Sequence, residues 1–296
     1  MNNLIVASFN ESSDFARRLA KRLSLKHLEI IHKRFPDGEN YIRFPTDIKG
    51  KKVIFVDFMR NDEEILRLIF ALKTGRELKA NKNILVAPYM PYMRQDKMFN
   101  PGECVTNKAI ADFLNPNINS LFTVDAHIHR IKSLSDIFTC KTNNIESLDI
   151  ISDYIKKNFK DSVVVGPDAE SEQWVKEICK ITGLEGIVLI KKRFSSHKVE
   201  IAINEKEKQA IKGRNVIVFD DIISSGTTMF KIIKILKKNR VKKIDIICVH
   251  GIFAEGSYEK LMKEVDKVVS SNTIRHKSNK IDLIPSIAEN IRKELF

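Results

Sequence analysis

The stretch VIVFDDIISSGTT, residues Val216–Thr228, indicates the fold of this chain more clearly than any other. It begins with an unbroken apolar run, which is typical of a strand covered on both faces of a parallel sheet. Two adjacent carboxylates, Asp220 and Asp221, end the run, and a loop of small residues leads into an amphipathic segment. A strand, a small-residue loop and a helix in this order predict an α/β protein that binds an anion where the helix begins.

The residue types in this loop are those that bind a phosphate group. Backbone N–H groups at a helix start, with Ser and Thr hydroxyls, make a cradle for an anion, and a glycine lets the backbone approach it closely. We therefore assign a ribose phosphate to Ser224, Ser225, Gly226, Thr227 and Thr228. The two carboxylates repel phosphate, so we expect them to accept hydrogen bonds from ribose hydroxyls. For any single residue the alternative is structural, because a serine here can simply cap the helix.

The same order of strand and helix recurs along the whole chain. Helical periodicity near residues 63–79 and 227–239 separates apolar runs of strand length, and this alternation predicts mainly parallel sheets flanked by helices. The apolar runs lie at residues 4–9, 53–58, 84–89, 121–126, 163–168, 187–192, 216–221 and 244–253. In such sheets ligands bind beyond the carboxyl ends of the strands, so the residues after each run are the candidates for chemistry.

The length of 296 residues suits about two domains. The polar segment CKTNNIESLD near residues 140–148 is the best boundary, which predicts one domain at residues 1–144 and another at residues 145–296. Each half contains at least four candidate strands, so we expect two similar domains. The last segment, Ile284–Phe296, is a predicted helix that can pack back on the first domain.

The composition restricts the partners of the chain. A net charge of +13 suits nucleic acid or small polyanionic substrates, but the lysines are dispersed and no nucleic-acid-binding motif accompanies them, so we expect no nucleic acid partner. No apolar run has the length of a membrane span, and the first residues lack the pattern of a secretory signal. Four cysteines lie far apart without metal-binding or redox spacing. We therefore expect a cytoplasmic protein without membrane contact.

The Asp-Asp and Ser/Thr-Gly-x-Thr pattern of Val216–Thr228 resembles the signature of the type I phosphoribosyltransferase fold. Other segments extend the resemblance over essentially the full length to one family, the ribose-phosphate pyrophosphokinases. Arg34–Asn40 (RFPDGEN) resembles a family loop that reaches the adenine of ATP on a neighbouring subunit, and Pro88–Lys97 (PYMPYMRQDK) resembles a specific ATP-binding run. The resemblance assigns ATP binding to Phe35, Asp37, Gly38, Glu39, Arg94, Gln95, Lys97 and His127.

Two further segments match family motifs that bind metal or act on the reacting phosphate. His127, in Val124–Arg130, and Asp168, in Val165–Asp168, match family residues near Mg²⁺; the residues after Asp168 depart from the usual small pair. Lys191 and Arg193 match a Lys-x-Arg pair on a catalytic flap, which the hairpin-like residues 194–203 continue, and Arg193 also reaches ribose 5-phosphate. His129 receives no role.

The resemblance implies a ribose-phosphate diphosphokinase, a transferase of nucleotide biosynthesis. Such an enzyme moves the pyrophosphoryl group of Mg-ATP to the anomeric hydroxyl of ribose 5-phosphate, giving phosphoribosyl pyrophosphate and AMP. It also implies a homo-oligomer, at least a dimer, with the ATP site at a subunit interface. A salvage phosphoribosyltransferase and a non-catalytic regulatory or nucleic-acid-associated homologue are the alternatives. The ATP-binding segments argue against the first, and the presence of Lys191, Arg193 and Asp220 against the second.

Overall fold

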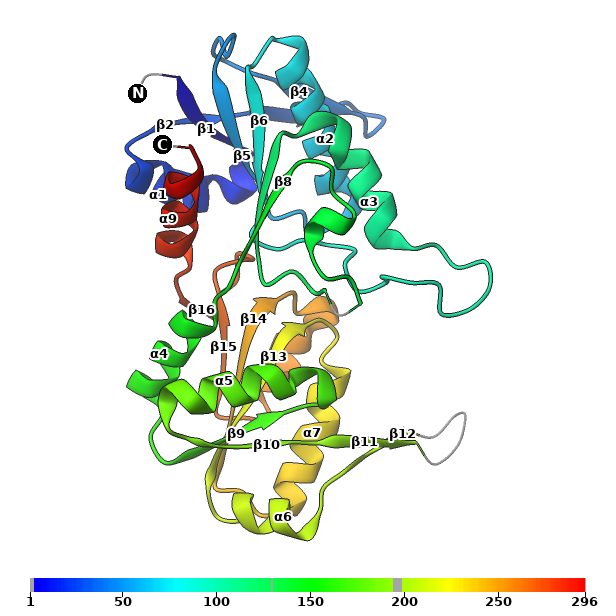
Figure 1. Cartoon of the computed structure of the whole chain (residues 1–296), viewed down its shortest axis with the longest axis vertical. Coiled ribbons are helices and arrows are strands. Elements are labelled where there is room, and N and C mark those ends of the chain that lie inside the picture. Colours follow the sequence, from blue (N-terminus) through cyan, green and yellow to red (C-terminus); the bar gives the residue numbers. More distant parts are fainter. Residues whose placement is uncertain (1–2, 129, 194–198, 296) are drawn as a thin grey trace. The chain divides into compact units, whose positions relative to one another are not determined.

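The computed structural model describes residues 3–128, 130–193 and 199–295. The chain forms two compact units, one made of Met1–Ile145 with Leu283–Phe296 and the other of Glu146–Asp282. The second unit ends earlier than the sequence boundary suggested, because helix α9 (Ile284–Leu295) packs against helix α1 (Ser13–Leu23) of the first unit. Figure 1 shows α9, in red, beside α1, in blue.

The first unit is built on a six-stranded sheet in which all neighbours are parallel, in the order β2-β1-β5-β6-β7-β8. Its strands are β1 (Leu4–Ser8), β2 (Lys26–Glu29), β5 (Lys52–Val56), β6 (Lys82–Val86), β7 (Ser120–Val124) and β8 (Lys141–Ile145). Its other helices are α2 (Asp62–Glu77) and α3 (Thr106–Leu114), with short 3-10 turns at Asn10–Ser12, Asn115–Asn117 and Leu134–Asp136.

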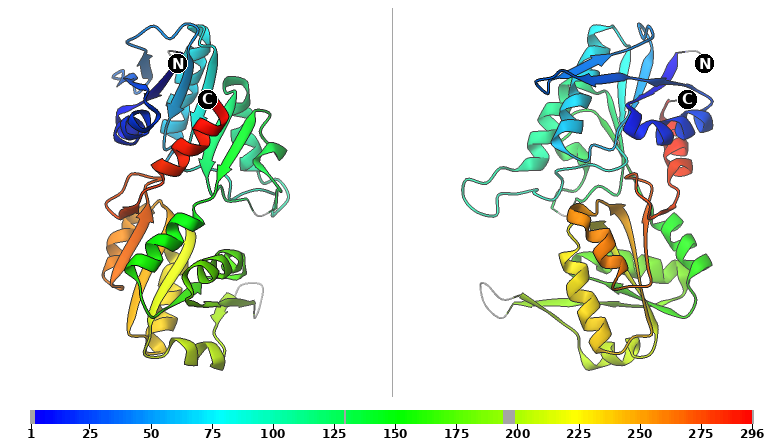
Figure 2. Two further views of the ribbon diagram at one scale, coloured as in Figure 1. Left: turned by 60° about the vertical axis from the view of Figure 1, so that its left-hand side comes forward. Right: turned by 180° about the vertical axis from the view of Figure 1, so that it is seen from behind.

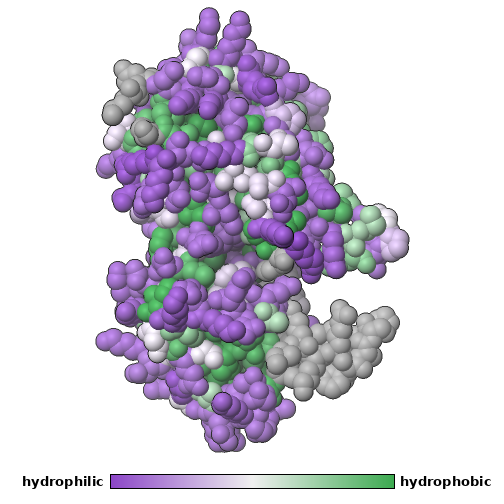
Figure 3. All heavy atoms as spheres, in the orientation of Figure 1, coloured by the Kyte–Doolittle hydropathy of each residue, from purple (hydrophilic) through white to green (hydrophobic). Residues whose placement is uncertain are grey.

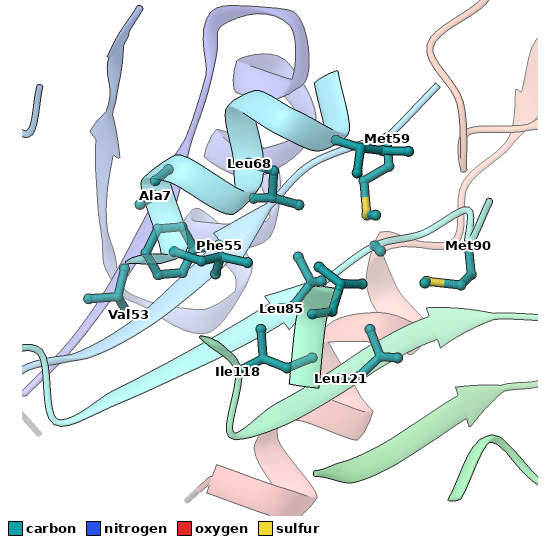
Figure 4. Packing of buried hydrophobic residues seen from close by; sticks show 14 of the residues in the cluster. Ala7, Val53, Phe55, Met59, Leu68, Leu85, Met90, Ile118 and Leu121 are labelled. Atoms are coloured by element: carbon teal, nitrogen blue, oxygen red, sulfur yellow. The ribbon is translucent and has the colours of Figure 1, made fainter. Parts of the chain in front are cut away.

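Side chains of alternate residues in the strands of this sheet point to opposite faces. Ile5 and Ala7 join Phe55, Leu68 and Leu85 in one apolar cluster under α2 and α3, as Figure 4 shows for part of the cluster. The α1 and α9 residues that are buried belong to the other face of the sheet. This double coverage explains why the strands have unbroken apolar runs instead of an alternating pattern.

The second unit repeats the arrangement with a parallel sheet in the order β10-β9-β13-β14-β15-β16. Its strands are β9 (Ser162–Gly166), β10 (Glu185–Val188), β13 (Asn215–Ile223), β14 (Lys243–Gly251), β15 (Lys267–Ser271) and β16 (Asn279–Ile281). Its helices are α4 (Leu148–Asn158), α5 (Glu172–Thr182), α6 (Glu205–Ile211), α7 (Thr227–Lys238) and α8 (Ser257–Met262), with 3-10 turns at Ala169–Ser171 and Ala254–Gly256.

Helices again cover both faces of the second sheet. Residues of β9, β13 and β14 pack with α7 and Leu261 of α8 in one apolar cluster. Helix α5 contacts β9 and β10 and packs against α4, as Figures 1 and 2 also show. No helix within the described residues has the length and apolarity needed to cross a membrane.

Each unit also has an antiparallel hairpin at the same point of its topology. Strands β3 (Ile31–Arg34) and β4 (Asn40–Arg43) form one hairpin, and β11 (Ile190–Arg193) and β12 (Val199–Ala202) form the other. Each hairpin follows the edge strand next to the first strand of its unit and precedes the central strand, β5 or β13. The two units are therefore two copies of one topology, although no repeat is visible in the sequence.

Candidate active site

The order of strands reverses between β9 and β13 in the second unit, which is where an open α/β sheet binds its ligand. The loop between β13 and α7 lies at this point. Gly226 has φ +74°, in the left-handed region, and occupies the N-cap position of α7. No side chain caps the helix and its first turn has no acidic residue, so the first N–H groups of α7 remain available to an anion.

The side chains of the loop are polar and accessible. Ser225 is exposed, Thr227 is exposed, and their hydroxyls form a hydrogen bond of 3.0 Å. Ser224 and Thr228 are partly buried at the two ends of the loop. The five residues that the sequence assigned to the ribose phosphate thus run from the end of β13 into the first turn of α7.

Two carboxylates precede this loop at the carboxyl end of the sheet. The side chain of Asp220 accepts a hydrogen bond from the Asp221 N–H at 3.1 Å. Burial raises the pKa of Asp220 well above its usual value, and the negative charges of Asp221 and Asp168 raise it further. Three acidic groups therefore interact at one place, where positive charge from a ligand or ion stabilises their ionised forms.

Asp168 follows β9, the strand next to β13. It caps the short turn Ala169–Ser171, accepting a hydrogen bond from the Glu170 N–H at 3.1 Å, while its own carbonyl accepts from the Ser171 hydroxyl at 2.5 Å. A side chain at Gly166 would collide with the Ser171 hydroxyl at 2.2 Å, so Ser171 packs where only a glycine leaves room. The residues that depart from the usual small pair thus form a capped turn that keeps Asp168 at the sheet edge.

In the first unit the predicted ATP residues follow two neighbouring strands, β6 and β7. Pro88–Lys97 follows β6, and the Val124 N–H at the end of β7 donates to the Pro88 carbonyl at 3.3 Å. His127 comes three residues after Val124 and is partly buried. The turn before it is fixed because the Ala126 N–H donates to the Asn144 side chain at 2.9 Å. Arg94, Gln95 and His127 thus follow strands that end at one edge of the sheet.

On either side of Gln95 the chain has a basic residue, and one of them lies beside an aromatic ring. Arg94 and Lys97 are exposed, and the Lys97 ammonium lies 5.3 Å from the centre of the Phe99 ring. Arg130, which was not predicted as a site residue, has its guanidinium at the same distance from that ring and forms a 2.8 Å ion pair with buried Asp96. The only signal for this pair was that both residues lie within predicted ATP-binding segments.

The turn Phe35–Glu39 belongs to the β3–β4 hairpin, outside the main sheet. The Gly38 N–H donates to the Phe35 carbonyl, and Gly38 has φ +94°, which a glycine adopts without strain. Half of the Phe35 surface is exposed, and the side chains of Asp37 and Glu39 are also exposed. An ion pair joins Arg34 to Glu63 at the start of α2. The hairpin and the loop around residue 100 leave the unit at different places, as Figures 1 and 2 show.

Lys191 and Arg193 lie in β11, whose pairing with β12 makes the hairpin that the sequence predicted. Lys191 pairs with Ile201 and Arg193 with Val199 in the register of the two backbones. Residues 194–198, which were also assigned to this hairpin, and His129, which was given no role, lie outside the described residues.

Comparisons with known proteins decide the family. Residues 4–116 match the family model of the N-terminal domain of ribose phosphate pyrophosphokinase, and residues 139–283 match that of the phosphoribosyl transferase domain. A ribose-phosphate pyrophosphokinase of Methanopyrus kandleri is 30% identical over 97% of this chain and 98% of its own, and one of Pyrococcus furiosus is 35% identical over 91% and 94%. The chain belongs to the ribose-phosphate pyrophosphokinase family.

A solved structure supports the fold of this family member. The phosphoribosylpyrophosphate synthetase of Mycobacterium smegmatis superimposes with a TM-score of 0.84 over 98% of both chains, at 21% identity. The predicted family, the two phosphoribosyltransferase-like α/β domains and the predicted enzyme class, a ribose-phosphate diphosphokinase, are confirmed. Figure 3 shows a mainly hydrophilic face with smaller apolar areas.

Proposed function

We propose that the chain transfers the pyrophosphoryl group of Mg-ATP to the anomeric hydroxyl of ribose 5-phosphate, giving phosphoribosyl pyrophosphate and AMP. The observation that carries the proposal is the loop Ser224–Thr228 at the strand-order reversal, where an uncapped helix start follows two carboxylates. The N–H groups and hydroxyls of the loop suit the 5-phosphate of the acceptor. Asp220 and Asp221 are suited to accept hydrogen bonds from its ribose hydroxyls.

We assign the ATP donor to the residues that follow β6 and β7. Arg94 and Lys97 supply positive charge for the triphosphate, and Gln95 has an amide that can bond the nucleotide. His127 is proposed to contact the triphosphate end of the same nucleotide. Phe35 offers an exposed ring for stacking on adenine, and the carboxylates of Asp37 and Glu39 can accept hydrogen bonds from its amino group.

Mg²⁺ is the proposed metal, with Asp168 and His127 as candidate ligands. A divalent cation relieves the repulsion that the charges of Asp221 and Asp168 exert on Asp220. Mg²⁺ usually keeps several waters and takes few protein ligands, so we expect one or two protein ligands, with substrate phosphates and waters completing the shell. When bound, Mg²⁺ offsets the repulsion between phosphate oxygens.

Lys191 and Arg193 are the proposed catalytic residues. The reaction moves a highly charged group between two oxygens, and its rate depends on positioning and on charge neutralisation in the transition state. Two cations on one hairpin can together neutralise the charge of the transferring group. A preorganised donor of this kind is typically worth about 10²–10³ in rate.

We also propose that the chain is a homo-oligomer in which the Phe35–Glu39 turn completes the ATP site of a second copy. An apolar groove of about 420 Å³ lies between α2 and α3, and its wall includes Leu66, Ile69 and Phe113. Leu66 is 46% exposed and Phe113 is 64% exposed, which is unusual for large apolar side chains. Asp62 lines the groove, and the next residue, Glu63, forms an ion pair with Arg34 of the hairpin. A second copy of the chain is therefore the proposed occupant of this groove.

The cytoplasmic location stays a prediction.

One assay separates this function from its alternatives. The protein is incubated with ribose 5-phosphate and Mg-ATP, and AMP and phosphoribosyl pyrophosphate are measured together. We expect both products in equal amounts. A salvage phosphoribosyltransferase would instead consume phosphoribosyl pyrophosphate when a nucleobase is added. A binder without catalytic activity would give neither result.

A further inference from the structure

The turn that follows β14 has an unfavourable backbone. Phe253 has φ +49° and Glu255 has φ +57°, both in the left-handed region although neither is glycine, and Gly256 follows with φ +68°. Each such non-glycine residue costs on the order of 1–3 kcal/mol and persists only where its surroundings hold it in place. The contacts that stabilise this turn in its unfavourable conformation therefore indicate its role.

The turn is tied to the backbone of the ribose-phosphate loop. The N–H groups of Ile252 and Phe253 both donate to the Ile223 carbonyl at 3.0 Å, at the end of β13. The Ser257 hydroxyl, at the start of α8, donates to the Ser224 carbonyl at 2.7 Å. Ser257 is 1% exposed, so water does not compete for this bond. Three hydrogen bonds thus connect the strained turn and the start of α8 to Ile223, the last residue before the phosphate cradle, and to Ser224, its first residue.

Packing fixes the other side of the turn. The Phe253 ring lies 5.4 Å from the Tyr258 ring and 4.7 Å from the His276 ring, measured between centres. A Cβ atom added at Gly226 would meet the Ser257 Cβ at 3.4 Å, so α8 is in close contact with the loop itself. Ser257 is therefore buried beside a packed aromatic group and in close contact with the loop.

We propose that Ser257 is a positioning residue for the 5-phosphate of the acceptor, an inference that rests on the proposed function of the loop. The peptide group is planar and trans, so the carbonyl of Ser224 and the N–H of Ser225 point in opposite directions. Binding of that carbonyl by Ser257 therefore turns the Ser225 N–H away from α8. The strained turn holds one N–H of the cradle in its binding orientation before the phosphate dianion arrives.

Preorganisation of this kind strengthens the binding of ribose 5-phosphate, the acceptor substrate, and leaves the binding of ATP unchanged. Without the Ser257 hydroxyl, the peptide between Ser224 and Ser225 can rotate. Ordering this peptide then reduces the binding free energy of the phosphate. The loss of one hydrogen bond typically changes an equilibrium by about threefold to tenfold. We expect this factor in the KM for ribose 5-phosphate, with the KM for ATP and kcat changed by less than about twofold.

The test compares Ser257→Ala with Ser162→Ala. Ser162 is similarly buried, in the same unit, but it is the first residue of β9, at the amino ends of the strands and away from the loop, where its hydroxyl donates to the Lys160 carbonyl at 3.2 Å. Both variants lose a buried serine hydroxyl, so both are expected to melt at a slightly lower temperature. Only Ser257→Ala is expected to raise the KM for ribose 5-phosphate. Ser257→Thr keeps the hydroxyl and is expected to restore most of the affinity.

An equal KM for ribose 5-phosphate in both alanine variants overturns the inference. So does a threonine variant that folds but behaves like the alanine variant. If Ser257→Ala does not fold, the threonine variant and Ser257→Cys, a weaker donor, are compared with the wild type, and an unchanged KM in the cysteine variant counts against the role. A wild-type protein that neither binds nor consumes ribose 5-phosphate refutes the proposed function itself, which is a separate result.

Discussion

Asp57 and Asp220 occupy the same position in the two units. Lys52 of β5 pairs with Leu4, the first residue of β1, and Asn215 of β13 pairs with Ser162, the first residue of β9; each aspartate comes five residues later. In the second unit a loop of small residues follows Asp220. In the first unit, Asn61 caps α2 and three acidic residues fill its first turn, which excludes a phosphate from the equivalent place.

The negative charge of Asp57 is instead balanced by a cation of the same unit. Buried Arg67 lies 3.3 Å from the Asp57 carboxylate and 2.9 Å from Glu11, with its guanidinium over the Phe9 ring. Burial nevertheless raises the pKa of Asp57 to about 6, because desolvation outweighs the attraction of Arg67. The carboxyl thus takes up a proton more readily in the folded state than in the unfolded state, whose pKa is near 3.8.

Asp57→Asn is expected to change how stability depends on pH. The raised pKa stabilises the fold fully below about pH 4, and this contribution is lost as the pH rises through about 6. A pKa rise of this size corresponds to about 3 kcal/mol. Denaturant unfolding curves should therefore show that the free energy of unfolding of the wild type falls, relative to that of Asp57→Asn, between about pH 4 and about pH 6. Asp47→Asn, at an exposed carboxylate of the same unit, serves as the control; a flat difference for Asp57→Asn would refute the assignment.

Gly226→Ala tests whether the loop needs its glycine for the ligand or only for its backbone. Gly226 and Gly213 have similar φ values, +74° and +71°, so alanine at either position should cost about 1–2 kcal/mol of stability. A Cβ atom at Gly213 meets nothing within 4 Å, whereas one at Gly226 lies 3.3 Å from Phe230. We expect comparable losses in melting temperature, but a raised KM for ribose 5-phosphate only in Gly226→Ala. Equal kinetics in the two variants would contradict the site.

Lys191→Ala and Arg193→Ala should lower kcat by about 10²–10³ if these cations stabilise charge in the transition state. Thermal melts should change little, because the residues lie in a two-stranded hairpin outside the main sheet. Lys192→Ala, at the position between them, is the matched control and should keep most of the activity. Near-normal turnover in both test variants would refute the catalytic assignment.

The cross-subunit role of the hairpin turn predicts complementation. Asp37→Ala damages the turn and Lys191→Ala the catalytic hairpin, so each variant alone should be nearly inactive. In mixed oligomers an intact turn from one copy can complete the site of another copy that retains Lys191. Some activity should therefore return after mixing. Its absence, once exchange of subunits has been proven by mass spectrometry, would place the turn within its own subunit.

Leu66→Glu places a charge in the apolar groove between α2 and α3 and should dissociate the proposed oligomer. Leu78→Glu is the control, because Leu78 is similarly exposed, at 43% against 46%, but lies at the other end of α2. Light scattering after size-exclusion chromatography gives the mass of each species. An unchanged mass for Leu66→Glu would show that the second copy binds elsewhere.

The sequence predicted the central strands of both sheets, since these are covered on both faces and consist of unbroken apolar residues. It also predicted the edge strand β10, through the run at residues 187–192, but it missed β2, β8, β15 and β16, which lie at or next to the edges. Strand β8 has the sequence KTNNI, which we interpreted as a polar boundary between domains. Its polar side chains have structural partners: Asn144 accepts from the Ala126 N–H, and Asn143 donates to Glu294 of α9. Periodicity and hydropathy cannot reveal such contacts with residues distant in the sequence.

The site was predictable where one continuous segment contains it. Asp220–Thr228 could be assigned because strand, carboxylates, glycine and helix follow one another in the sequence. Ser257 could not, because its contact with Ser224 joins residues 33 positions apart and requires two non-glycine residues with positive φ. The same holds for the ion pair of Asp96 with Arg130, which tertiary packing alone brings together.

The return of α9 to the first unit makes that unit discontinuous in the sequence, with the whole second unit inserted into it. During synthesis, β1 to β8 leave the ribosome first, but the surface of α1 that packs against α9 stays uncovered until the residues after 282 have been made. The second unit, being continuous, can finish folding before the first one does. The unit that begins first is thus the last to be completed, and a fragment that stops at residue 145 should be prone to aggregate.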